Sequence, residues 1–89
     1  MAAGADGVKL RNLGRTSARM LAEVGIDSAE KLQELGAVPA YCLVKSAFPD
    51  TSRNLLWAIY GALKDIDWRD VSAETKAQLD RQVAKFQFA

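Results

Sequence analysis

Apolar residues recur at intervals of three and four along most of this 89-residue chain, and no segment sustains a strict alternation of apolar and polar residues. The first pattern is typical of helices that bury one face, whereas a half-buried strand would need the alternation. Glycine and proline interrupt the helical pattern at Gly14, Gly25, Gly36 and Pro49, and these residue types end helices. The sequence therefore predicts an all-α fold, a compact bundle of five or six short helices.

Capping residues and helix breakers set the expected boundaries. Hydroxyl and carboxylate side chains accept hydrogen bonds from the free N–H groups of a first helical turn, and proline is tolerated there. The predicted helices are a short turn over Leu10–Leu13, one from Thr16 or Ser17 to Val24, one that Asp27 begins and Gly36 ends, one with Pro39 in its first turn that ends at Pro49, one over residues 52–65, and one that Ser72 begins. The inner faces of the third and last of these helices are expected to carry Leu32, Leu35, Thr75, Leu79, Val83 and Phe86.

The segment over residues 52–65 is the most apolar of the chain, because Trp57 and Tyr60 extend a broad apolar face nearly all round the helix. A helix that is apolar on most sides is normally buried at the centre of a bundle. Gly61 lies inside this helix, where glycine costs about 1 kcal/mol relative to alanine, so we expect another helix to pass close to its backbone. Trp68 is expected to close over the same helix as part of the core; the alternative is a half-exposed ring at an interface.

Residue counts exclude several kinds of chemistry. The chain has no histidine and a single cysteine, Cys42, which excludes Ser-His and Cys-His nucleophiles, an internal disulfide and cysteine-rich zinc sites. The segment that starts at Asp65 is not a calcium loop, since Asp70 stands where that loop needs glycine and Lys76 where it needs glutamate. We therefore predict no enzyme activity, no catalytic or metal-binding residue, no cofactor and no small-molecule substrate, and a buried, unreactive Cys42.

Length and composition indicate one domain outside any membrane. Residues 1–7 carry no periodic pattern and are expected to form a disordered tail, and residues 8–89 a single helical domain. The chain lacks the basic and apolar start of a signal peptide, and its longest uncharged stretches are too short to cross a membrane. Together with the single cysteine, these features predict a cytoplasmic protein without membrane contact.

The segment from Leu10 to Arg19 has the order of a helix-hairpin-helix corner, with a tight turn at Gly14 between two helices. Helix starts bind phosphate through free N–H groups, and glycine lets the phosphate approach the backbone. Although the net charge is only +1, residues 1–19 carry four basic side chains against one acidic side chain. The residues expected to contact DNA phosphates are Arg11, Gly14, Arg15, Thr16 and Arg19. The alternative is a purely structural corner, because a full hairpin motif has glycine in place of Asn12.

A second hypothesis concerns protein partners. If the bundle leaves part of the 52–65 helix uncovered, Trp57 and Tyr60 form an apolar surface patch, and such patches bind partners. The partner would be another protein or a second copy of this chain. The alternative is that both rings simply pack in the core.

Three longer stretches carry a family resemblance: LRNLGRTSARMLAEVGI (10–26), DSAEKLQELGAVPAY (27–41) and NLLWAIYGALKDIDWRDV (54–71). Together they resemble the C-terminal domain of the TfoX/Sxy competence regulators, from about Leu10 to Leu79. The resemblance implies an all-helical fold with a helix-hairpin-helix-like core. It further implies a role in bacterial cytoplasmic proteins that help to turn on competence genes, and it implies no catalytic residues. The full-length regulators also carry a separate N-terminal domain.

Residues and resemblance together predict a non-enzymatic regulatory binding domain. We expect it to contact DNA weakly and without sequence preference through the turn at Gly14. The alternative function is a protein-interaction or self-association module that does not bind nucleic acid.

Overall fold

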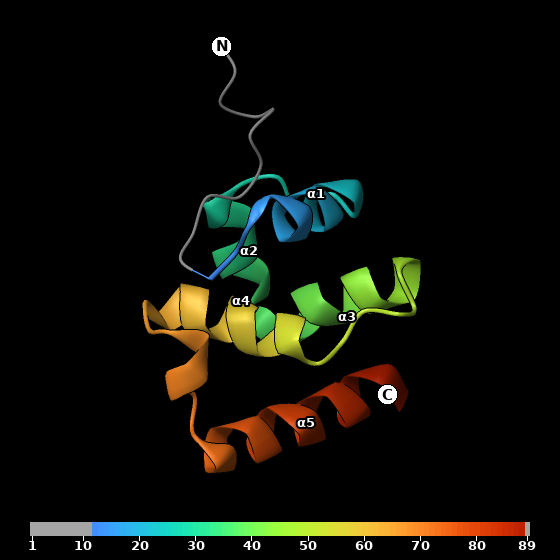
Figure 1. Ribbon diagram of the computed structural model, residues 1–89. Helices are drawn as coiled ribbons and strands as arrows, with labels where there is room; N and C mark the ends of the chain where they lie inside the picture. Colours follow the sequence, from blue (N-terminus) through green and yellow to red (C-terminus); the bar gives the residue numbers. More distant parts are fainter. Residues whose placement is uncertain (1–11, 89) are drawn as a thin grey trace.

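The computed structural model describes residues 12–88, with side chains up to residue 86 (Figure 1). Its elements are α1 (Arg15–Glu23), α2 (Ala29–Leu35), α3 (Ala37–Ala47), α4 (Asn54–Lys64), the single-turn 3₁₀ helix η2 (Trp68–Asp70) and α5 (Ala73–Phe88). These residues contain no strand, so the predicted all-α bundle is confirmed. The tail expected over residues 1–7 lies outside the described part of the chain.

The segment before α1 differs from the predicted short helix. Asn12 lies in a turn and Leu13 belongs to no helix, so the last two residues of the expected Leu10–Leu13 helix are not helical. Leu10 itself lies outside the described residues. The likeness to a helix-hairpin-helix corner therefore stays a prediction.

Helix caps follow the sequence at some ends and depart from it at others. Ser72 caps α5, since its Oγ accepts a hydrogen bond from the Thr75 N–H at 3.1 Å, as predicted. At the start of α2 the cap is Ser28 rather than Asp27: the Ser28 Oγ accepts from the Lys31 N–H at 3.1 Å. Asp27 instead pairs its carboxylate with the Lys31 ammonium at 3.0 Å.

The end of α1 follows the predicted glycine stop. Gly25 has a φ of +90°, a left-handed conformation that glycine adopts without the steric cost of a Cβ. The N–H of the next residue, Ile26, donates to the carbonyl of Leu21 at 2.9 Å, and the N–H of Gly25 donates to Ala22. These two bonds are a Schellman motif, which satisfies the free carbonyls of a helix end.

The helices form three levels, with α1 and α2 on one side, α3 and α4 in the middle and α5 across the other side (Figure 1). α3 packs against α1, α2, α4 and α5. It contributes Ala40, Tyr41 and Val44, which are at most 1% exposed. The central position predicted for the 52–65 segment is therefore shared between α4 and α3, because α3 touches both outer levels.

Basic side chains help to join α5 to the middle level. The Arg53 guanidinium, at the start of α4, lies 5.5 Å from the centre of the Tyr41 ring and pairs its Nε with Asp80 of α5 at 2.8 Å. Lys76 of α5 lies 5.5 Å from the centre of the Trp57 ring. Cations above aromatic faces are attracted to the ring quadrupole, so these contacts add electrostatic attraction to the apolar packing of α5.

Three side chains predicted to face the core are exposed. Leu35 is 40% exposed and Phe86 51% exposed; both lie in the last turn of their helices, where the helix has fewer neighbours to pack against. Trp68 is 37% exposed: its backbone N–H is bonded to Asn12, and its ring lies beside an open pocket. The core predictions for Leu35, Phe86 and Trp68 were wrong; for Trp68 the exposure agrees with the half-exposed alternative, whose interface role stays a prediction.

Gly61 lies where other parts of the chain approach α4 closely. A Cβ added there would lie 2.6 Å from the Asn12 Nδ2 and 2.7 Å from the Ile66 carbonyl oxygen. The predicted close packing is confirmed, but the neighbours are a side chain and the loop after α4 rather than a second α-helix. Glycine is needed here for space, since only its missing side chain leaves room for both groups.

We expect Gly61→Ala to lower the free energy of unfolding by about 1–3 kcal/mol, because overpacking against backbone outweighs the better helix propensity of alanine. Ala58→Gly, in the same helix, is the control and should cost about 1 kcal/mol from propensity alone. Urea denaturation of both variants provides the measurement. If propensity governed both positions, the two substitutions would change stability in opposite directions, and a more stable Gly61→Ala variant would contradict the close approach.

Candidate nucleic-acid interface

The start of α1 exposes backbone donors that no side chain caps. Its N-cap is Gly14, no side chain accepts a hydrogen bond there, and the first turn holds no acidic residue. The first N–H groups of an α-helix have no acceptor within the helix and carry partial positive charge. Gly14, Arg15 and Thr16 are all exposed. This end of α1 is therefore open to an anion.

The hydroxyl caps predicted at Thr16 and Ser17 were wrong, because the helix begins before them at Arg15. Gly14 has a φ of −84°, and a Cβ added to it would meet no heavy atom within 4 Å. Neither backbone conformation nor packing requires glycine here. What its missing side chain provides is an uncovered backbone at the helix start.

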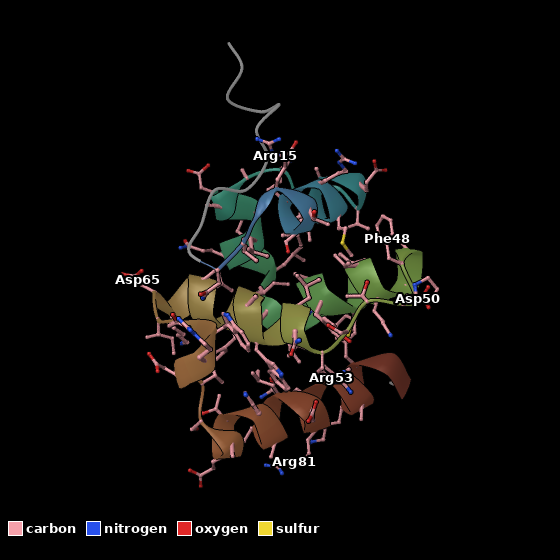
Figure 2. All side chains as sticks on the ribbon, viewed as in Figure 1. Arg15, Phe48, Asp50, Arg53, Asp65 and Arg81 are labelled. Carbon is pink, nitrogen blue, oxygen red and sulfur yellow. The ribbon has the colours of Figure 1, made fainter. Side chains whose placement is uncertain are left out.

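Two arginines flank this start on one side of α1. Arg15 and Arg19 are four residues apart, a spacing that places side chains on the same helix face, and both are exposed. Figure 2 shows Arg15 pointing away from the body of the bundle. Neither arginine makes an ion pair within the described residues. The structure thus brings Gly14, Arg15, Thr16 and Arg19 together, while Arg11 lies outside the described residues.

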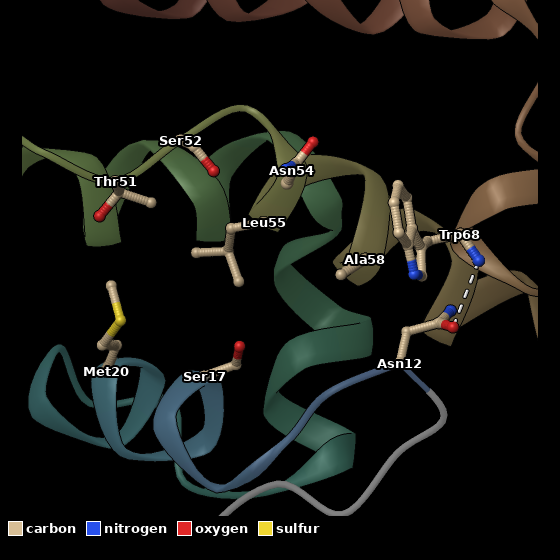
Figure 3. Close-up of a pocket in the computed structure, with 9 residues that line it drawn as sticks. All are labelled: Asn12, Ser17, Met20, Thr51, Ser52, Asn54, Leu55, Ala58 and Trp68. Carbon is tan, nitrogen blue, oxygen red and sulfur yellow. Dashed lines mark hydrogen bonds between the residues drawn. The ribbon is translucent and has the colours of Figure 1, made fainter.

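Asn12 holds the start of α1 against the connection between α4 and α5. Its Nδ2 donates a hydrogen bond to the Ile66 carbonyl at 2.8 Å. Its Oδ1 accepts one from the Trp68 N–H at 3.2 Å, the bond drawn in Figure 3. Its φ of +72° lies in the left-handed region, which asparagine tolerates better than most residues. Sequence reasoning took Asn12 only as a departure from a hairpin glycine. Asparagine and glycine both adopt a positive φ more readily than other residues, and this shared property could have indicated that Asn12 occupies the position of the hairpin glycine.

A pocket of about 400 Å³ opens between α1 and the first half of α4 (Figure 3). The side chains around it are Asn12, Ser17, Met20, Thr51, Ser52, Asn54, Leu55, Ala58 and Trp68. Met20 and Trp68 lie toward opposite ends, with Ser17 and Leu55 between them (Figure 3). The pocket is thus adjacent to the first turn of α1, to which Ser17 belongs.

Comparison with known proteins identifies the family of this chain and a solved structure with the same fold. The model of the TfoX C-terminal domain family matches residues 6–83. This chain belongs to that family. A solved structure, of an uncharacterized protein from Listeria monocytogenes, superposes with a TM-score of 0.79 at 22% identity, over 89% of this chain and 90% of that chain. At that identity the likeness shows a shared fold. No curated protein matches the chain.

The two rings of the predicted partner patch differ in exposure in this TfoX C-terminal domain. Trp57 is 8% exposed and packs in the core beneath Lys76. Tyr60 is half-buried, with the Lys64 ammonium 5.8 Å from its ring centre, and lines a second pocket of about 430 Å³. Of the two rings, only that of Tyr60 offers surface to a partner.

The remaining reactive groups of the TfoX C-terminal domain are few. Cys42 is buried, and its burial raises the pKa of the thiol, although the charge of Arg53 acts in the opposite direction. A raised pKa leaves less thiolate, the nucleophilic form. The described residues hold no group of three side chains suited to a metal ion. None of the helices over residues 12–88 has the length and apolar character that a membrane span requires.

We expect Asn12→Ala to be more destabilising than Asn12→Gly. Both variants lose the two hydrogen bonds of the amide, worth about 1 kcal/mol each, but only alanine also bears the cost of about 1 kcal/mol for a left-handed φ. Guanidinium denaturation should therefore rank wild type above Asn12→Gly and Asn12→Gly above Asn12→Ala. Equal stability of all three proteins would show that the amide does not hold the two segments together.

Proposed function

We propose that this TfoX C-terminal domain is a non-enzymatic regulatory domain that binds the DNA backbone weakly and without sequence preference. The observation that carries the proposal is the uncapped start of α1, which has no acidic residue in its first turn and is flanked by Arg15 and Arg19, two arginines without an ion pair among residues 12–88. Phosphate oxygens match both the free backbone N–H groups and the guanidinium donors. Contacts of this type read phosphates rather than base edges and carry no sequence information.

The number of available contacts limits the expected affinity. The net charge is only +1, and in the described part of the chain Arg15 and Arg19 are the basic side chains of α1; the sequence adds Arg11 as an expected third contact. Two or three phosphate contacts give a weak complex whose affinity falls steeply with salt. Weak backbone contact suits a domain that works beside another DNA-binding element. The family resemblance supports such a role in bacterial cytoplasm, at the control of competence genes.

The non-enzymatic part of the proposal rests on the available side chains. The sequence contains no histidine, the side chain whose ordinary pKa suits proton transfer near neutral pH. Its single cysteine is buried with a raised pKa. These features favour binding over catalysis.

Fluorescence anisotropy on a labelled duplex tests the proposal. From 50 to 200 mM salt we expect about ten- to fortyfold weaker binding, a log–log slope of roughly −2 to −3, and Arg15→Ala/Arg19→Ala should flatten it by about two units. The control is Arg81→Ala/Lys85→Ala on α5, which removes two unpaired charges of the same spacing away from any helix start.

The control separates a specific contact from bulk charge. If both double variants flatten the slope equally, the start of α1 has no special role. If the wild type does not bind the duplex at 50 mM salt and high-micromolar protein, the DNA proposal is wrong.

Self-association is the second candidate function, and exposed apolar side chains support it. Leu43 of α3 is 41% exposed and Phe86 of α5 is 51% exposed, and α3 and α5 pack against each other. Exposed apolar side chains that gather into one patch mark contacts with other proteins, and the packing of α3 on α5 brings together the helices that carry Leu43 and Phe86. The half-buried Tyr60 lies in the second pocket, which also borders both helices.

Sedimentation velocity over a range of concentrations tests this second candidate. We expect a dimer at high-micromolar concentration that Leu43→Ser/Phe86→Ser returns to a monomer, because hydroxyl side chains remove the apolar contact. The matched control is Ser46→Ala, a small change at another exposed position of α3. A wild-type protein that stays monomeric throughout would contradict self-association.

A further inference from the structure

The pocket between α1 and α4 is lined without charge. None of its nine lining residues is acidic or basic, so a charged group placed inside would lose water without gaining a countercharge. Its volume of about 400 Å³ lies near the lower end of pockets that hold small ligands. The group that fits best is therefore small and uncharged.

Uncharged polar groups border the pocket beside its apolar walls. The side chains of Ser17, Ser52 and Asn54 and the indole N–H of Trp68 make no hydrogen bonds within the described part of the chain. The hydroxyls of Ser17, in α1, and of Ser52, in the loop before α4, face the pocket from opposite sides (Figure 3). Hydroxyls and amides both donate and accept, which suits a ligand with donors and acceptors along one edge.

Trp68 gives the pocket a flat aromatic wall whose backbone is fixed. Its N–H is bonded to Asn12, and its Cα lies only 3.4 Å from the position of a Cβ at Gly61. Its side chain is nevertheless 37% exposed, at one end of the pocket (Figure 3). An exposed, positioned indole is a stacking surface for a planar heterocycle.

The pocket and the proposed phosphate position share the first turn of α1. Ser17 faces the pocket and directly follows Thr16, whereas Arg15 points to the opposite side of the helix (Figures 2 and 3). A strand that crosses the start of α1 can therefore place a phosphate at Arg15 and Thr16 and turn its base toward Ser17 and Trp68. A paired base in a duplex cannot make this turn without leaving its partner.

We infer that the pocket binds an unpaired nucleobase stacked on Trp68, so that this domain prefers single-stranded nucleic acid to a duplex. The inference rests on the proposed contact between α1 and the nucleic-acid backbone. A planar base uses all the features present, namely an aromatic wall, edge hydrogen-bonding groups and no charge. An apolar side chain of a partner protein would leave the hydroxyls of Ser17 and Ser52 without partners.

Competition anisotropy with the full chain tests the inference, using a labelled oligodeoxythymidylate of about 15 nucleotides and a duplex of similar length. We expect the single strand to bind at least about fivefold more tightly than the duplex, since a base–aromatic stack contributes roughly five- to 150-fold in affinity. Trp68→Ala should remove this preference and leave duplex binding unchanged. Trp68→Phe, which keeps a stacking ring, should retain most of it.

Intrinsic fluorescence gives a second readout that needs no variant. Trp57 is buried and Trp68 is exposed, so stacking should quench the exposed indole when the single strand is added, and the duplex should quench it less. This measurement decides the matter if Trp68→Ala does not fold, which circular dichroism would show.

The outcomes separate the inference from the proposed function. Equal affinity for both probes, with no effect of Trp68→Ala, overturns the base pocket and leaves backbone binding intact. Absence of binding to either probe overturns the proposed function itself. If Trp68→Ala instead abolishes self-association in sedimentation, the pocket receives a protein side chain and the nucleobase inference is wrong.

Discussion

The hydrogen bonds of one amide side chain join the segment before α1 to the connection between α4 and α5. Asn12 precedes α1, yet it bonds to the backbone of Ile66 and Trp68 beyond α4. These bonds fit only because Gly61 has no side chain in the same space. The position of the α1 start, the orientation of Trp68 and one wall of the pocket all depend on this contact between three segments.

Most basic side chains in the described part of the chain already have structural partners. Those of Lys31, Lys45, Arg53, Lys64, Arg69 and Lys76 contact carboxylates, carbonyls or aromatic rings. Arg15 and Arg19 differ in being unpaired beside an uncapped helix start. A nearly neutral protein can therefore still present a local site for an anion, because most of its other described basic side chains are already bound to partners within the fold.

The sequence was sufficient to predict features that depend on local chemistry. Helical periodicity, the glycine stop at Gly25 and the hydroxyl cap at Ser72 involve neighbours within one or two turns, and the structure confirms them. The exposure of Phe86 was not predicted, and the sequence could not decide between a buried and a half-exposed Trp68, because exposure depends on which distant elements cover each side chain. The role of Asn12 was missed for the same reason: its partners are 54 and 56 residues away. For the candidate site, residue types and spacing identified the exposed positions around Gly14, but not the pocket beside them.

The long separation between Asn12 and its partners has a consequence for biosynthesis. A chain emerges from the ribosome amino end first, and its early segments can begin to fold before the later ones exist. Here the segment made first acquires its final position only after residues 66–68 have left the exit tunnel, because the carbonyl and N–H that hold Asn12 belong to them. α1 can form its own turns and pack on α3 earlier, but the contact that fixes the segment before it must await residues 66–68.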